Sequence, residues 1–72
     1  MNGKRKGDAT MTNQQIAQLA RENGYRADRE GGGIVVWLIT RKPSQIEIGR
    51  ELDIPRGLIH HHPQGVVIYG SE

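Results

Sequence analysis

The stretch that decides the fold is SQIEIGRELDIPRGLIHHH, residues 44–62 of the 72-residue chain. It opens with Ser44 and, three residues later, Glu47, which is the spacing of a capping box and predicts that a helix begins here. Ile48 and Leu52 stand four residues apart and give that helix an apolar face. The rest of the chain is then expected to hold this unit in place.

The second half of the stretch predicts a turn and a second short helix, over about 56–62. Pro55 suits the first turn of that helix, where the missing N–H of proline costs little, and Pro63 ends it. Residues 45–48 alternate between polar and apolar side chains, so a strand at the start of the stretch stays an open alternative.

In its order of apolar and small residues, this stretch resembles a helix-turn-helix unit. The positions that carry the resemblance are Ile48, Gly49, Leu52, Ile54 and Ile59. The pattern departs at Asp53, where the turn usually has glycine. The resemblance implies either DNA reading or a small wedge for a protein surface. The second helix offers few side chains for base reading, namely Arg56 and the histidines at 60–62.

A first helix is predicted ahead of this stretch. Thr12 and Gln15 have the spacing of another capping box, and Gly24 suits the left-handed residue that follows a helix end. Between them an apolar stripe recurs at helical spacing, formed by Ile16, Leu19 and Ala20. We therefore expect a helix that begins at Thr12 and ends at Asn23-Gly24.

Three stretches predict strands, about residues 25–30, 34–40 and 65–70. The run at 34–40, IVVWLIT, is rich in β-branched residues and apolar on both faces, so it should be central or covered on its second face. The charged stretch 25–30 is expected to pair with 34–40 across three glycines. The stretch 65–70, near the end of the chain, is expected to pair with 34–40 as well. The order predicts a single α+β domain over 12–70, with a short antiparallel sheet and a minimal winged-helix-like arrangement.

The net charge of +2 lies in the first residues of the chain rather than in the predicted domain. Residues 1–11 contain Lys4, Arg5 and Lys6 and almost nothing to bury, so they predict a disordered basic tail. Two interpretations of that tail stay open. It is an arm that contacts phosphates or the acidic surface of another protein, or it is a solubilising extension. Residues 11–72 carry seven basic and seven acidic side chains, so they lack the net basic charge typical of DNA-binding domains.

Several function classes lack the residues that they need. There is no cysteine, and the longest apolar run, Ile34–Ile39, is too short to span a bilayer, so we expect a soluble cytoplasmic protein without a membrane partner. The glycines at 31–33 precede a strand and no Gly-Lys-Ser/Thr follows, which argues against nucleotide binding. Adjacent histidines at 60–62 point in different directions, so they do not form a metal site. No catalytic set is present, and neither an enzyme, a cofactor nor a small-molecule substrate is predicted.

From MNGKRKG through TNQQIAQLARENGYRADREGGG, the chain resembles very small phage-encoded transcription regulators. They are of the type with which a Xanthomonas phage inhibits host RNA polymerase and promotes antitermination. No sharp motif carries the likeness, so it assigns no contact residue. It implies direct binding of RNA polymerase in the bacterial cytoplasm, with inhibited initiation or altered termination. DNA binding and inhibition of another host protein remain alternatives, and we expect a monomer.

Candidate binding residues are basic or aromatic side chains. Trp37, the single tryptophan, is interpreted first as a core residue and second as a hot spot of a protein interface, which Arg26 and Arg29 would flank. The full set comprises Lys4, Arg5, Lys6, Arg26, Arg29, Trp37, Arg41, Lys42, Arg56, His60 and His61.

Overall fold

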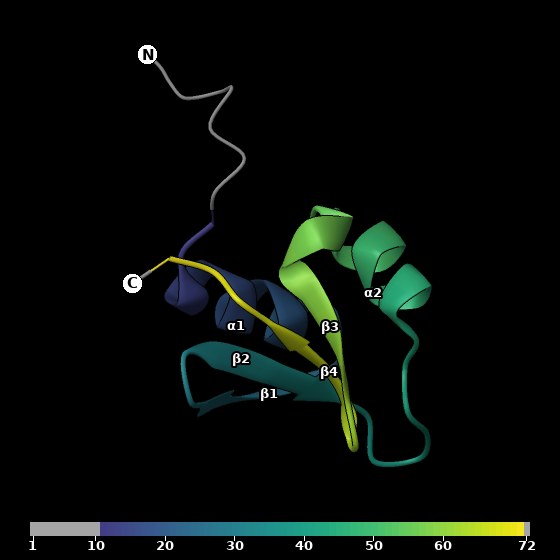
Figure 1. Ribbon diagram of the computed structural model, residues 1–72. Helices are drawn as coiled ribbons and strands as arrows, with labels where there is room; N and C mark the ends of the chain where they lie inside the picture. Colours follow the sequence, from purple (N-terminus) through teal and green to yellow (C-terminus); the bar gives the residue numbers. More distant parts are fainter. Residues whose placement is uncertain (1–10, 72) are drawn as a thin grey trace.

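A computed structural model describes residues 11–71, and it folds them into two helices packed on one face of a four-stranded sheet (Figure 1). The elements are α1 (Asn13–Glu22), β1 (Arg26–Glu30), β2 (Gly33–Trp37), α2 (Gln45–Leu52), the 3₁₀ turn η1 (Arg56–Leu58), β3 (Ile59–His62) and β4 (Gly65–Ile68). The strands lie side by side in the order β1-β2-β4-β3, and all neighbours are antiparallel. The predicted α+β class is confirmed.

Both ends of α1 are defined by its own sequence. The Thr12 side-chain oxygen accepts from the Gln15 N–H at 3.1 Å, and Gln15 Oε1 accepts from the Thr12 N–H at 2.9 Å, so the predicted capping box is present. At the other end Gly24 has a φ of 88°, and the Tyr25 N–H donates to the Ala20 carbonyl at 3.0 Å. This is the Schellman arrangement, and the first helix is confirmed.

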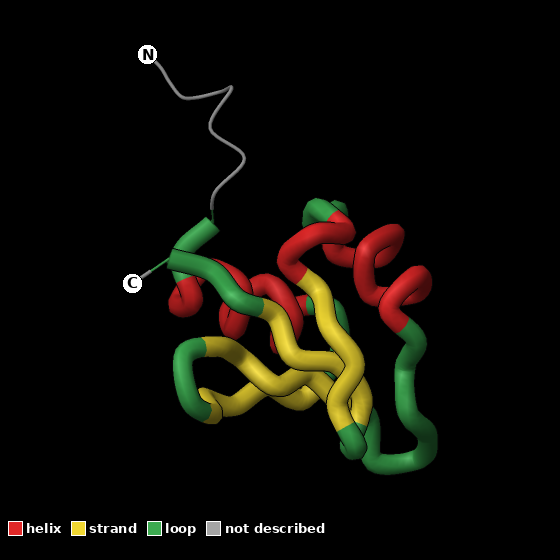
Figure 2. Tube along the Cα trace, in the orientation of Figure 1, coloured by secondary structure: helices red, strands yellow, loops and turns green. Residues whose placement is uncertain are grey.

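The three predicted strands are present with shorter bounds. β1 and β2 form a hairpin across the two-residue loop Gly31-Gly32, and Gly31 has the positive φ, 62°, that such a loop favours at its first position. β4 pairs with β2, so the end of the chain is tied to its middle. The strand predicted over 34–40 ends at Trp37, because neither neighbouring strand extends further to pair with it. Residues 38–44 form the loop to α2, green in Figure 2.

The structure resolves the open alternative at 45–48 and contradicts the second helix predicted over 56–62. Ser44 Oγ accepts from the Glu47 N–H at 3.0 Å, and residues 45–48 are helical. After α2, however, η1 lasts three residues and the chain continues as β3. The prediction of a second helix, and with it of a helix-turn-helix, is therefore wrong. The winged-helix-like arrangement is not confirmed.

Residues 59–62 form a strand because β4 lies beside them and satisfies their backbone groups. A helix over 56–62 would be short, and short isolated helices are marginal. Gly57 weakens it further, by up to about 1 kcal/mol relative to alanine. Ile59 is β-branched and suits a strand, where its side chain enters the core opposite Ile68.

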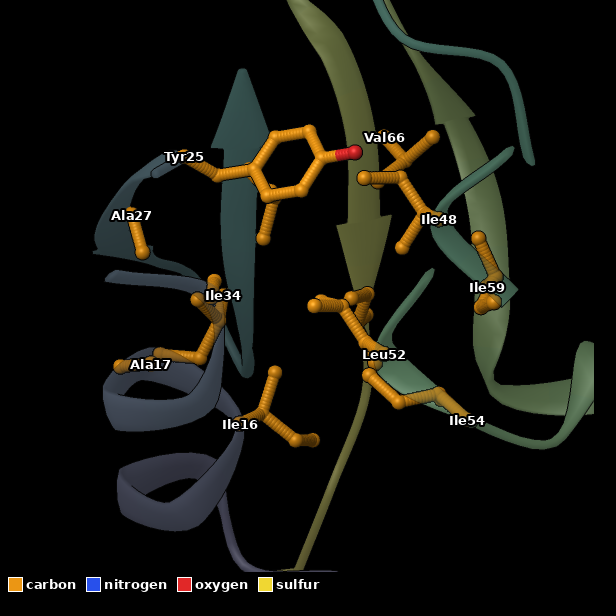
Figure 3. Packing of buried hydrophobic residues seen from close by; sticks show 13 residues of the cluster. Ile16, Ala17, Tyr25, Ala27, Ile34, Ile48, Leu52, Ile54, Ile59 and Val66 are labelled. Carbon is orange, nitrogen blue, oxygen red and sulfur yellow. The ribbon is translucent and has the colours of Figure 1, made fainter. Parts of the chain in front are cut away.

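One buried cluster joins both helices to the inner face of the sheet (Figure 3). Ile16 of α1 belongs to this cluster together with Ile48 and Leu52 of α2, and all three are almost fully buried. Ile54 and Ile59 are buried beside them, so the apolar positions predicted as core in 44–62 are confirmed. Burying one such aliphatic side chain stabilises the fold by about 1.5–3 kcal/mol.

Neither helix formed by residues 11–71 covers the outer face of the sheet, yet two valines on this face are buried. Val35 and Val67 pair across β2 and β4 and are 2% and 7% exposed. His62 Nε2 lies 3.1 Å from Glu30 Oε2, and the strand register places the valine pair midway between these two residues. Side chains of the sheet itself therefore cover the apolar centre of this face, and the central position predicted for β2 is confirmed.

Candidate functional site

Trp37 and Arg26 lie side by side at one end of the sheet. They are cross-strand partners at the end of β2 and the start of β1, so both side chains project from the outer face. Trp37 is half-buried and stands outside the buried cluster. The interpretation of Trp37 as a core residue is therefore wrong, because the core lies on the opposite face of β2.

The loop after β2 extends this surface with apolar and basic side chains. Ile39 is 74% exposed, the largest fraction for a large apolar side chain among residues 11–71. Two hollows of about 730 and 490 Å³ lie against the loop and share residues 37–40 as lining. We name this region the Trp37 surface and define it as Arg21, Arg26, Trp37, Leu38, Ile39, Thr40, Arg41 and Lys42.

Arg41 holds the loop to α2. Its guanidinium donates to both carboxylate oxygens of Glu47 at 2.6 and 2.5 Å, and the Tyr25 hydroxyl donates to the same carboxylate at 3.1 Å. The hydrogen bonds from Arg41 hold the pKa of Glu47 below its ordinary value of 4.5. Burial raises the pKa of Tyr25 above 10.0, and its hydrogen bond to Glu47 adds to the rise. The Glu47 carboxylate thus contacts the loop rather than the start of its own helix.

Arg21 reaches the Trp37 surface from α1. Its Nη2 donates to the Ala27 carbonyl at 2.8 Å, and its side chain lines the larger hollow together with Arg26. The sequence alone does not mark Arg21 as a binding residue, because it resembles any charged residue near a helix end. Only the packing of α1 against β1 brings it to the site.

Arg29 and Arg56 do not join this surface. Arg29 stands opposite Ile34 in the β1–β2 pair, so its side chain leaves from the face opposite to that of Arg26. A spacing of three residues brings side chains together on a helix but separates them on a strand. The prediction that Arg29 flanks Trp37 is therefore wrong. Arg56 is exposed in η1 and lines neither hollow.

The histidines divide between the two faces of β3. His60 and His62 share the outer face with Trp37, whereas His61 projects from the opposite face. His60 packs edge-on against Tyr69, with ring centroids 5.3 Å apart. Among residues 11–71, no three or more His, Cys, Asp or Glu side chains are grouped so that they could hold a metal ion.

The basic residues of the predicted tail, Lys4, Arg5 and Lys6, lie outside the described residues. Within residues 11–71, neither helix has the length and apolar character that crossing a membrane requires.

Comparison of the chain with protein-family models, with curated proteins and with solved structures finds no match. The interpretation of the site therefore rests on its geometry and chemistry.

Proposed function

We propose that the protein is a small phage-type transcription regulator that binds host RNA polymerase directly and inhibits initiation, alters termination, or both. The observation that supports protein binding is the exposure of Ile39 beside Trp37, with Arg26 and Lys42 on either side. Tryptophan and arginine dominate the energetics of protein interfaces, and exposed apolar residues grouped with them are typical of such surfaces. RNA polymerase is the partner that the resemblance implies.

The hypothesis of sequence-specific DNA reading depended on a second helix over 56–62, which the structure does not contain among residues 11–71. The helix that would enter the major groove is absent among the described residues, since 59–62 pair with β4 as a strand. Of the candidate reading residues, Arg56 lies in η1, and His60 and His61 project from opposite faces of β3. Direct readout needs several side chains on one element that fits the groove. DNA binding therefore ranks behind protein binding.

Retention of purified bacterial RNA polymerase tests the proposal. The full chain is immobilised and challenged with core enzyme and with holoenzyme at low micromolar concentration, and an albumin-coated support is the control. Retention that free protein competes away supports the proposal. If neither form of the polymerase is retained above the control, the proposal is overturned.

A transcription assay then tests regulation. Purified polymerase is given a template with a strong promoter and a terminator, and the yields of terminated and read-through RNA are measured. We expect less promoter-initiated RNA, more read-through, or both. Unchanged yields at saturating protein contradict a regulatory role. Capture of a different protein from a host lysate, without polymerase, supports the alternative of an inhibitor of another host protein.

A further inference from the structure

We propose that the Trp37 surface binds an extended acidic segment of a partner protein, with an apolar residue of that segment seated against Ile39. The inference rests on the proposed function, because it describes the chemistry of the partner at the same surface. The occupant is a stretch of polypeptide in which aspartate or glutamate flanks an apolar residue. Three features of the surface support it: its shape, its charge and its free cations.

Residues 37–40, three of which are apolar, lie where two open hollows meet, and we call this segment the ridge. Residues 37–40 line both the larger hollow, of about 730 Å³, and the smaller one, of about 490 Å³. Ile39 stands on this ridge with 74% of its surface exposed. Side chains of an extended chain point alternately to opposite sides, so such a chain laid across the ridge reaches both hollows.

The basic side chains of the folded part concentrate here. Of the seven Lys and Arg residues in 11–71, four line the two hollows, namely Arg21, Arg26, Arg41 and Lys42. Of the six acidic residues in 11–71, Asp28 lines the larger hollow and Glu47 binds Arg41. Four positive and two negative charges leave a net +2 here, whereas three positive and four negative charges leave −1 elsewhere in 11–71. A charge count along the chain hides this separation.

Within residues 11–71, two of the four cations have partners and two do not. Arg41 is paired with Glu47, and Arg21 donates to a backbone carbonyl. Among the described residues, Arg26 and Lys42 form no ion pair or side-chain hydrogen bond. Arg26 lines the larger hollow and Lys42 the smaller one, so a free positive charge lies on each side of the ridge. This pattern complements two acidic residues that flank an apolar anchor.

A single-stranded nucleic acid fits this surface less well. Proteins that bind single strands offer aromatic faces for base stacking along a continuous basic groove. The most exposed apolar side chain here is the aliphatic Ile39, while Trp37 is half-buried. An acidic polypeptide with an aliphatic anchor is therefore the better match.

Trp37 is the single tryptophan, so its emission reports on this surface directly. A short peptide of alternating aspartate and leucine is titrated into the full chain while the emission is followed. We expect a saturable change that weakens as salt rises from about 50 to about 500 mM, because salt screens exposed charges. The same peptide with lysine in place of aspartate should give no saturable change. The proposal is overturned if the acidic peptide gives none either.

A matched pair of double variants tests the charges. Arg26→Glu/Lys42→Glu reverses both free cations and should weaken peptide binding about tenfold, since each exposed pair contributes modestly. Arg50→Glu/Arg56→Glu makes the same change in net charge at exposed positions outside the surface and should alter binding by less than about twofold. Equal losses in the two double variants would contradict a local role for Arg26 and Lys42.

A second matched pair tests the apolar anchor. Ile39→Ser should weaken peptide binding about tenfold, the effect of losing one buried aliphatic contact. Ile46→Ser changes the other exposed isoleucine, which is 54% exposed on α2, and should leave binding unchanged. Thermal melting curves establish that each variant is folded, which is expected because both positions are exposed. Binding by Ile39→Ser at wild-type affinity overturns the proposal.

Failure of this inference and failure of the proposed function give different results. Retention of polymerase by Arg26→Glu/Lys42→Glu at the wild-type level overturns the inference alone. Peptide binding without polymerase retention overturns the function alone. A Trp37 response to oligothymidylate, but not to the acidic peptide, identifies a nucleic-acid surface and overturns the inference. So does a dimer in sedimentation whose formation changes Trp37 emission without ligand, because it assigns the surface to a second copy of the chain.

Discussion

The Glu47 carboxylate accepts three hydrogen bonds, two from Arg41 and one from Tyr25. Arg41 belongs to the loop after β2, Tyr25 precedes β1 and Glu47 lies in α2, so one carboxylate joins three parts of the chain. The fork of the guanidinium matches the two carboxylate oxygens, which fixes the direction of the loop more firmly than a single contact would. Arg41 is thereby held at the edge of the Trp37 surface.

Glu47→Gln removes the charge that this contact requires, and its cost should depend on pH. The pKa of Glu47 is lower in the folded chain than its ordinary value of 4.5. The ionised carboxylate therefore stabilises the fold above about pH 4.5, and that contribution is lost as pH falls through the folded-state pKa. Urea unfolding from about pH 7 to about pH 3 should show the wild type losing its advantage over the variant.

The control for this prediction is Glu51→Gln. Glu51 is an exposed glutamate on the same helix, and it forms no ion pair with another described residue. Its substitution should change stability by less than about 0.5 kcal/mol. A difference between wild type and Glu47→Gln that is the same at every pH would contradict the role assigned to the charge.

At the scale of elements, β3 is the edge strand that stands where a second helix was predicted. Its outward-facing backbone is partly used within the chain: the Ile59 N–H donates to the Arg56 carbonyl, and the Ile59 carbonyl accepts from the Gln45 side chain at 3.1 Å. At the opposite edge, Arg21 donates to the Ala27 carbonyl of β1. Edges that are partly occupied in this way offer less backbone for the addition of another strand.

Hydrogen exchange distinguishes β3 from a helix. The Tyr69 N–H donates to the Leu58 carbonyl at 3.0 Å, so the antiparallel alternation directs the N–H groups of His60 and His62 toward β4 and that of His61 outward. We expect the amide of His61 to exchange about tenfold or more faster than those of its two neighbours. A helix over 56–62 would protect all three alike, so equal protection factors by NMR would contradict the strand.

At the scale of the whole molecule, Asn13 connects segments that are far apart in the sequence through hydrogen bonds. Its N–H donates to the Ser71 carbonyl at 2.8 Å, its Oδ1 accepts from the Gly70 N–H at 2.9 Å, and its Nδ2 donates to the Gly32 carbonyl at 3.2 Å. The side chain is buried, with a relative exposure of 2% for the residue. Asn13 therefore links the start of α1 to the tip of the β1–β2 hairpin and to the segment after β4.

Asn13→Ala should destabilise the protein by about 1–3 kcal/mol, because it removes two hydrogen bonds of a buried side chain and leaves the Gly70 N–H and the Gly32 carbonyl without this partner. Chemical unfolding followed by circular dichroism measures the change. Gln14→Ala is the matched control, since Gln14 is the next residue of α1 and is exposed, and it should cost less than about 0.5 kcal/mol. If the two variants unfold at the same denaturant concentration, Asn13 does not hold the fold together.

The sequence by itself determined the elements whose ends are encoded within a few residues. Thr12 and Gln15 fix the start of α1, Gly24 its end and Ser44 the start of α2, because these contacts join near neighbours along the chain. The run of β-branched and aromatic residues in 34–40, apolar on both faces, likewise identified a central strand. The apolar spacing in 44–62 identified core residues correctly. It did not show that Ile59 would reach the core from a strand, β3, rather than from a helix.

Only the tertiary structure decided the conformation of 59–62 and the make-up of the Trp37 surface. Residues 59–62 became a strand because β4, a partner from the end of the chain, stands beside them. Arg21, Arg26 and Lys42 share one surface because α1, β1 and the loop after β2 meet there, and the strand period sends Arg29 to the other face. Local sequence sets the period and the caps of each element, whereas distances between elements depend on how their apolar faces pack.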